Sequence, residues 1–244
     1  ALEAGASDFA ADADVFEITT EPEDFSGVRE DLEAKGYTFV SAEVEMVPDV
    51  YSAIEDPESV VKMEKLLDVL KEKGVKATFF MIGSQAEECP ELVKRVAAEG
   101  HQIGIHTYSH VDLSCLTQEE QKEEIEKSIA AIESAIGTTE LKLRPPFGKI
   151  SGSLEAWLDM PLILWSLDTV DWKGTDAAQI IREAVRDVRD GDIILMHDIF
   201  KESVDAAEIF IPQLLQEGYQ LVTVSELAAA KGITLENGTA YGSF

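Results

Sequence analysis

The sequence is poor in cysteine, with only Cys89 and Cys115 among 244 residues, and these two belong to no CxxC pair. This scarcity excludes a disulfide framework, which needs several paired cysteines, and a zinc site built from thiolates. We therefore expect both residues to be ordinary core or surface thiols.

Positive charge is also scarce, since 20 lysines and arginines stand against 48 aspartates and glutamates, for a formal net charge of -28. This surplus repels phosphate backbones and anionic lipids, so we expect no nucleic-acid partner and no membrane partner. No apolar run reaches the roughly 18 residues of a membrane-spanning helix. The segment ALEAGASDFAADADVF lacks the basic and apolar regions of a signal peptide, so we expect none here, and the compartment stays open.

From residue 76 onward, apolar strand patterns alternate regularly with amphipathic helix patterns. The segments predicted as strands are 76–83, 101–107, 141–147, 162–169, 191–199 and 219–227. The segments predicted as helices are 90–100, 117–137, 177–188 and 207–218. This alternation is typical of a parallel sheet or barrel, in which functional side chains gather at the carboxyl ends of the strands.

The first part of the chain has a different pattern. It predicts a strand at 14–20, a helix at 22–36 that Gly36 ends, and an alternating strand at 37–47. These elements indicate a ferredoxin-like α/β segment. An amphipathic helix at 55–74 then leads into the alternating part of the chain.

Histidine is rare, and three of the four histidines lie at or just beyond the carboxyl ends of predicted strands. His106 and His110, in HTYSH, are four residues apart, so a helical turn or a tight loop can direct both imidazoles at one divalent metal ion. A third ligand must come from elsewhere. The alternative is a pair of ordinary histidines near a helix start. His101, which precedes its strand, is expected to be structural.

A second set of polar residues follows later strands. His197 ends the apolar strand DIILMH and can act as a general acid or base, although a half-buried structural histidine is the alternative. Asp171, in LDTVDW, can orient and stabilise that imidazole, or it can be an exposed loop residue. Arg144 begins the stiff RPPFG turn, and a guanidinium held there suits a bidentate pair with a carboxylate.

Five motifs in this order, KATFFMIG, GHQIGIHTYSH, LRPPFG, WSLDTVDW and IILMHD, resemble those of NodB-type polysaccharide deacetylases, carbohydrate esterase family 4. The resemblance covers about residues 71–244. It implies an α/β fold, an incomplete (β/α) barrel, and hydrolysis of acetyl groups from polymers such as peptidoglycan, chitin or acetylated xylan. The partner it implies is an acetylated polysaccharide or oligosaccharide, and no protein partner is predicted.

The resemblance also implies a role for each motif residue. His106 and His110 would bind a divalent metal ion, with zinc expected and cobalt or nickel as alternatives. Arg144 would position the catalytic base, and Asp171 would tune His197, the general acid. The residues expected to contact substrate are Leu195, beside the acetyl methyl, together with Trp172 and Phe147.

The sequence departs from the family at its first motif, because no TFDDG occurs in the chain. Counting back from the shared helix places that Asp pair at Glu55 and Asp56. Asp56 would then complete the metal site and Glu55 would be the base, displaced by about one methylene, so activity is expected to be impaired. The alternative is that both residues only cap the next helix. Pro57 replaces the glycine of the motif, and Ile105 stands where the family has Asn.

Residues 1–70 resemble instead the last domain of YebC-like regulators, through ALEAGASDF, DVFEITTEPEDFSGVREDLEAKGY and SAEVEMVPDV. We therefore expect a natural or engineered chimera, in which 1–54 completes the barrel edge of 55–244. The strand at 37–47, or the segment 50–54, would replace the first barrel strand. A catalytically inactive chimera is the alternative function. Deacetylases of this type are usually secreted or on the cell surface, and YebC-like proteins are cytoplasmic.

Overall fold

The computed structural model describes residues 8–11, 16–19, 24–37 and 57–244, and the chain divides into two compact units, Ala1–Tyr51 and Ser52–Phe244. In the first unit, strands β1 (Asp8–Ala11) and β2 (Phe16–Thr19) pair antiparallel.

Helix α1 (Phe25–Ala34) completes the described part of this unit. Val28 and Leu32, one helical turn apart, are buried, and Ile18 of β2 packs against them. Gly36 follows the helix at a φ of 89°, a conformation that favours glycine. The strand expected at 37–47 lies outside the described residues, so the ferredoxin-like arrangement stays a prediction.

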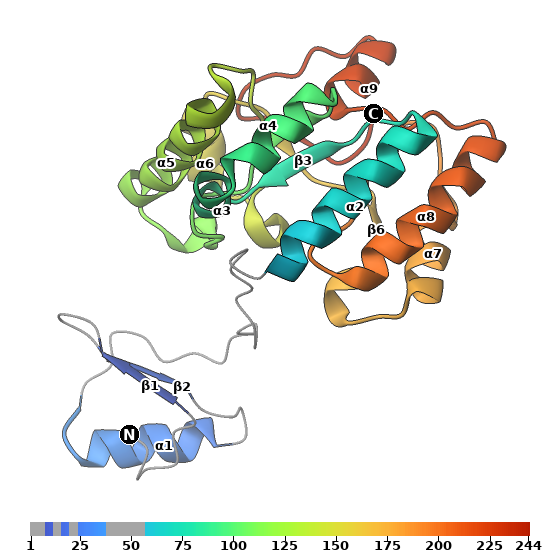
Figure 1. The fold of residues 1–244 in the computed structure, drawn as a ribbon. Helices are drawn as coiled ribbons and strands as arrows, with labels where there is room; N and C mark the ends of the chain where they lie inside the picture. Colours follow the sequence, from blue (N-terminus) through green and yellow to red (C-terminus); the bar gives the residue numbers. More distant parts are fainter. Residues whose placement is uncertain (1–7, 12–15, 20–23, 38–56) are drawn as a thin grey trace. The chain divides into compact units, whose positions relative to one another are not determined.

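The described part of the second unit alternates helices with short strands (Figure 1). Its strands are β3 (Thr78–Met81), β4 (Gln102–Ile105), β5 (Leu162–Ile163), β6 (Leu167–Asp168), β7 (Ile194–Leu195) and β8 (Ala240–Tyr241). Its helices are α2 (Pro57–Lys73), α3 (Gly83–Glu88), α4 (Pro90–Ala98), α5 (Gln118–Ile136), α6 (Gly152–Trp157), α7 (Ala177–Val185), α8 (Lys201–Gln216) and α9 (Val224–Ala230). No helix in the described ranges is long and apolar enough to cross a membrane.

The strands of the second unit pair in parallel, as the alternation predicts. β3 pairs with β4, and single bridges through Leu143 continue the sheet from Ile105 to Leu162 in β5. β5 pairs with β8, and β6 pairs with β7. The helices contact one another in the order α5, α4, α2, α8, α7 around these strands (Figure 1). This arrangement brings the carboxyl ends of the parallel strands to one side of the unit.

One large apolar core lies between the helices and the strands. Leu67 of α2, Ile105 of β4, Leu143, Ile180 of α7 and Leu214 of α8 are all fully or almost fully buried within it. Burial of each such side chain stabilises the fold by about 1.5–3 kcal/mol. The full burial of Ile105 also gives a physical reason for an apolar residue at this position.

Two segments predicted as strands, 141–147 and 219–227, form no strand in the structure. Segment 141–147 contributes only bridges at Leu143, since Pro145 and Pro146 have no N–H to continue a ladder. The second half of 219–227 is helix α9, which begins after Thr223. There the Thr223 hydroxyl accepts from the Glu226 N–H while the Glu226 carboxylate accepts from the Thr223 N–H, a capping box that overrides the alternating pattern.

Candidate metal and acid site

The two histidines of HTYSH lie in a tight loop directly after β4. The His106 N–H donates to the carbonyl of Met81 in β3, which fixes the start of the loop. Thr107 and His110 both have φ values near +60°, at 63° and 61°, so the segment is not a helical turn. The loop nevertheless brings the two imidazoles together, with ring centroids 4.9 Å apart at an interplanar angle of 65°.

The surroundings of His106 leave one ring nitrogen available for a metal. Its Nδ1 lies 2.6 Å from the carbonyl oxygen of Arg144. A carbonyl only accepts, so Nδ1 carries the proton and Nε2 keeps its lone pair. Burial lowers the pKa of His106 to about 3, and burial followed by the nearby His197 lowers the pKa of His110. Both imidazoles are therefore held neutral, the form that ligates divalent metals.

The described residues supply only these two ligands, because no group of three His, Cys, Asp or Glu side chains in the described ranges can hold a metal ion. The expected third ligand, Asp56, and the expected base, Glu55, lie outside the described residues. The two histidines fit a metal by their neutral charge and their proximity, and His106 also by its tautomer, but a metal requires a further ligand.

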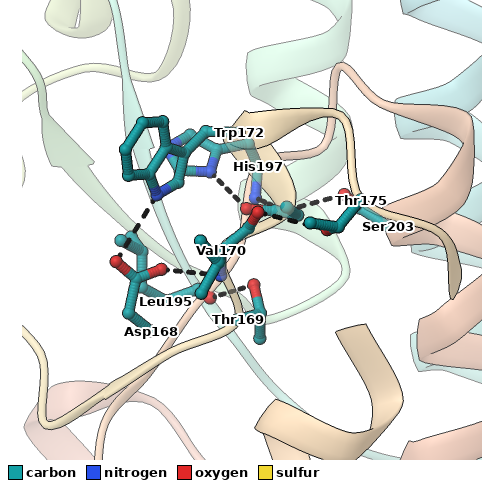
Figure 2. Close-up of polar contacts among 9 residues, drawn as sticks. Asp168, Thr169, Val170, Trp172, Thr175, Leu195, His197 and Ser203 are labelled. Atoms are coloured by element: carbon teal, nitrogen blue, oxygen red, sulfur yellow. Dashed lines mark hydrogen bonds and ion pairs between the residues drawn. The ribbon is translucent and has the colours of Figure 1, made fainter. Parts of the chain in front are cut away.

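His197, which Figure 2 shows near Ser203, follows β7 and pairs with the buried Asp171. Asp171 is only 1% exposed, and its Oδ1 lies 2.8 Å from Nδ1 of His197. Its Oδ2 accepts from the His197 N–H at 2.7 Å and from the Ser203 hydroxyl at 2.7 Å. Burial opposes ionisation, but the hydrogen bonds from His197 and Ser203 prevail and lower the pKa of Asp171. An ionised Asp171 fixes the Nδ1–H tautomer and leaves Nε2 of His197 free for proton transfer.

The segment before Asp171 is strained and held by hydrogen bonds. Val170 has a φ of 58°, rare for a β-branched residue, and such strain costs about 1–3 kcal/mol. The Val170 N–H donates to the Asp168 carboxylate at 2.8 Å, and the Thr175 hydroxyl donates to the Val170 carbonyl at 3.1 Å (Figure 2). The Thr169 hydroxyl donates to the carbonyl of Leu195 at 2.8 Å and ties the segment to β7. These contacts hold Asp171 in place against β7.

Arg144 is buried and 8% exposed. Its Nε donates to the carbonyl of Ile163 at 3.2 Å and its Nη2 to that of Leu164 at 3.0 Å, while the guanidinium lies 4.2 Å from the centroid of the Phe80 ring. Burial lowers its pKa to about 10. Within the described ranges no carboxylate forms an ion pair with Arg144. Burying a guanidinium is costly unless its N–H groups find acceptors, and two backbone carbonyls supply them here.

The three expected substrate contacts differ in exposure. Leu195 is buried in β7, whereas Trp172 is 44% exposed and Phe147 is 54% exposed. Trp172 donates from Nε1 to Asp168 at 3.4 Å (Figure 2), and Phe147, at a φ of 59°, lies 5.3 Å from the His110 ring. Phe147, beside His110, and Trp172 both offer exposed aromatic rings, which are chemically suited to sugar rings.

His101 lies away from these residues, at the start of β4. It is buried, its Nδ1 accepts from the Ala77 N–H at 3.2 Å, and its ring contacts Phe79 edge to face. These contacts are structural ones. Ser203, in contrast, touches the site and was not found from the sequence, since a serine in the first turn of a helix carries no distinguishing pattern.

The fold and the site together define an α/β protein with two adjacent histidines and an Asp–His pair at the strand ends. The family model described as "Polysaccharide deacetylase" matches residues 48–159. Peptidoglycan-N-acetylglucosamine deacetylase PgdA of Listeria monocytogenes is 37% identical over 68% of this chain, which spans only 36% of that protein. A peptidoglycan-N-acetylglucosamine deacetylase of Bacillus cereus is 33% identical over 84% of this chain and 99% of its own length.

A solved structure gives the same assignment. The family 4 acetyl xylan esterase from Clostridium thermocellum, in complex with a cobalt ion, is 32% identical with a TM-score of 0.71, covering 75% of this chain and 92% of that one. The chain belongs to the polysaccharide deacetylase family, carbohydrate esterase family 4. Its NodB-type α/β fold is confirmed, and a divalent metal cofactor fits this family. A second model, "TACO1/YebC second and third domain", matches residues 1–76.

Proposed function

We propose that this chain hydrolyses acetyl groups from a polysaccharide, either a polymer of N-acetylglucosamine or an acetylated xylan. The observation that carries the proposal is a pair of adjacent imidazoles, His106 and His110, together with His197 bound to the buried Asp171, all in loops that follow parallel strands. A proton donor beside a neutral imidazole pair is the combination that metal-assisted acetyl hydrolysis needs. The named activities of the relatives support this substrate class.

We assign the metal to His106, His110 and Asp56, a donor set suited to Zn²⁺, with Co²⁺ or Ni²⁺ as alternatives. When bound, the ion supplies Lewis acidity at the acetyl carbonyl. His197 donates the proton that the leaving amine or alcohol requires, and Asp171 stabilises the charged imidazole.

The remaining residues act on the base and on the substrate. Arg144 positions Glu55, which removes a proton from the attacking water. Leu195 borders the acetyl methyl, while Trp172 and Phe147 offer apolar surface to sugar rings. We propose that the activity is low because Glu55 and Asp56 replace the paired aspartates of TFDDG.

A catalytically inactive chimera is the second candidate. The YebC-type match reaches residue 76 and the deacetylase match begins at residue 48, so the two overlap where the family has its opening strand. In this case the barrel would fold and bind sugar or metal weakly without turnover.

Metal analysis and acetate release separate the two candidates. The purified chain, loaded with Zn²⁺ or Co²⁺, would be incubated with acetylated chitooligosaccharide, acetylxylan and a small acetate ester. We expect about one metal ion per chain and slow release of acetate from one polymer. If the chain binds metal but releases no acetate, the inactive chimera is favoured. If it binds no metal and releases no acetate, the proposed function is wrong.

Variants of the replaced motif test its assignment. Glu55→Gln is expected to abolish acetate release with metal retained, and Asp56→Asn is expected to lower metal content. If both variants keep the metal content and the activity of the parent chain, this assignment is wrong.

A further inference from the structure

Three residues, Thr107, Tyr108 and Ser109, separate the two histidines and set the position of one imidazole relative to the other. The residues on either side of Tyr108 and Ser109, namely Thr107 and His110, have left-handed backbone angles. Single residues of this kind persist only where their surroundings hold them. Any shift of this short loop therefore moves the His110 ring directly.

The carbonyl groups of the loop are held by α3. The Gly83 N–H donates to the carbonyl of Thr107 at 2.9 Å, and the Ser84 N–H donates to the carbonyl of Tyr108 at 3.0 Å. The contact is close, because a Cβ on Gly83 would lie 2.8 Å from the Tyr108 ring and 2.8 Å from the backbone of Ser128 in α5. The loop is thus packed between α3 and α5.

The N–H groups of the loop are held by one carboxylate, that of Glu124 in α5. Its Oε2 accepts from the N–H of Tyr108 and the N–H of Ser109, both at 2.9 Å. Its Oε1 accepts from the Ser109 hydroxyl at 2.8 Å. Three donors on one ionised group form charge-assisted hydrogen bonds, which are stronger than neutral ones.

The Tyr108 side chain adds a second link between the loop and the two helices. Its hydroxyl donates to Glu87 of α3 at 2.8 Å, and Lys127 of α5 lies 5.6 Å from the centroid of its ring. These contacts tie the side chain to α3 and α5, and among the described residues Glu124 is the acceptor for the backbone N–H groups of Tyr108 and Ser109.

We propose that Glu124 is a positioning residue of the metal site, holding the loop so that His106 and His110 present their rings to one ion. This inference rests on the proposed function, since it requires a metal at the two histidines. In this proposal Glu124 is not itself a metal ligand. It acts through its hydrogen bonds to the loop backbone. Removing its charge is expected to weaken metal binding more than it affects folding.

The test is a Co²⁺ titration of the full chain, followed by the visible absorption of the bound ion. Glu124→Gln keeps the size of the side chain but removes its negative charge, so the hydrogen bonds from Tyr108 and Ser109 are no longer charge-assisted. We expect an affinity at least about tenfold lower, as for other residues that orient metal ligands, with an altered absorption band.

Glu126→Gln is the matched control, because Glu126 is exposed on the same helix and its loss changes the net charge equally. It is expected to bind Co²⁺ like the parent chain. Ser109→Ala removes only the hydroxyl contact and is expected to give a smaller loss of affinity. Circular dichroism at each titration temperature establishes the folded fraction, to which every affinity is normalised.

The outcomes separate the two proposals. If the parent chain binds no Co²⁺, both the proposed function and the role of Glu124 are wrong. If the parent chain binds Co²⁺ and Glu124→Gln matches Glu126→Gln in affinity and spectrum, only the role of Glu124 is overturned. If Glu124→Gln does not fold, Ser109→Ala decides the question. A Ser109→Ala protein with the Co²⁺ affinity and absorption spectrum of the parent chain would then overturn the role of Glu124.

Discussion

At the scale of single residues, Asp171 shows how burial turns a carboxylate into a fixed partner for an imidazole. Its two oxygens accept from the His197 ring, the His197 N–H and the Ser203 hydroxyl. An asparagine has only one acceptor oxygen, so its NH₂ group would face at least one of these donors. We predict that Asp171→Asn lowers acetate release by about 10³- to 10⁴-fold. Asp187→Asn, a change at an exposed position, should leave the rate unchanged. Equal rates for the two variants would contradict the role of Asp171.

His101 supports a prediction on stability and pH. Burial, followed by the charge on Lys76, lowers the pKa of His101. Below the unfolded pKa of about 6.5, the unfolded chain binds a proton that the folded chain does not. The contribution of the neutral His101 to the free energy of unfolding is therefore complete above about pH 6.5. It is lost as the pH falls towards the pKa of His101 in the folded state.

This loss can reach about 1.4 kcal/mol per pH unit. His101→Asn keeps an acceptor for the Ala77 N–H but does not titrate. Urea unfolding between about pH 8 and pH 5 should show a smaller pH dependence for this variant than for the parent chain. An identical dependence in both proteins would show that His101 does not contribute.

At the scale of elements, the sequence predicted the parallel alternation well but not where helices take over from strands. The pattern YQLVTVSEL alternates like a strand, whereas the capping box of Thr223 and Glu226 begins α9 within it. Periodicity reports which residues are buried, and the local hydrogen bonds of a cap decide the backbone.

We predict that Thr223→Ala lowers the free energy of unfolding by about 1 kcal/mol, the usual contribution of a helix cap. Thr117→Ala, in the same kind of capping box before α5, is the comparison and should have a similar cost. Urea unfolding monitored by circular dichroism measures both. A Thr223→Ala protein as stable as its parent would mean that the cap contributes nothing to α9.

Some residues of the candidate site could be predicted from the sequence and others could not. His106, His110, Asp171 and His197 were found because their residue types are rare or follow apolar strands. Glu124 could not be found, because α5 contains many glutamates that are alike in sequence. Only the packing of α5 against the loop distinguishes the one that accepts from Tyr108 and Ser109.

At the scale of the whole molecule, the net charge of -28 affects the stability of the folded state. Like charges repel more strongly when the chain is folded, so charge of this size destabilises the native state. Added salt shortens the screening length from about 10 Å at 0.1 M to about 3 Å at 1 M. Screening weakens this repulsion, and it also weakens individual surface ion pairs, which contribute only about 0–1 kcal/mol each.

We therefore predict that raising NaCl from about 0.05 M to about 0.5 M increases the urea midpoint of the full chain. The measurement is made with a chelator present, so that metal bound at His106 and His110 does not stabilise the folded state. A neutral osmolality control, such as added glycerol at matched osmolality, separates screening from general solute effects. A midpoint that falls with salt would mean that attractive ion pairs, such as Lys65 with Asp205 and Glu208, outweigh the repulsion of the surplus carboxylates.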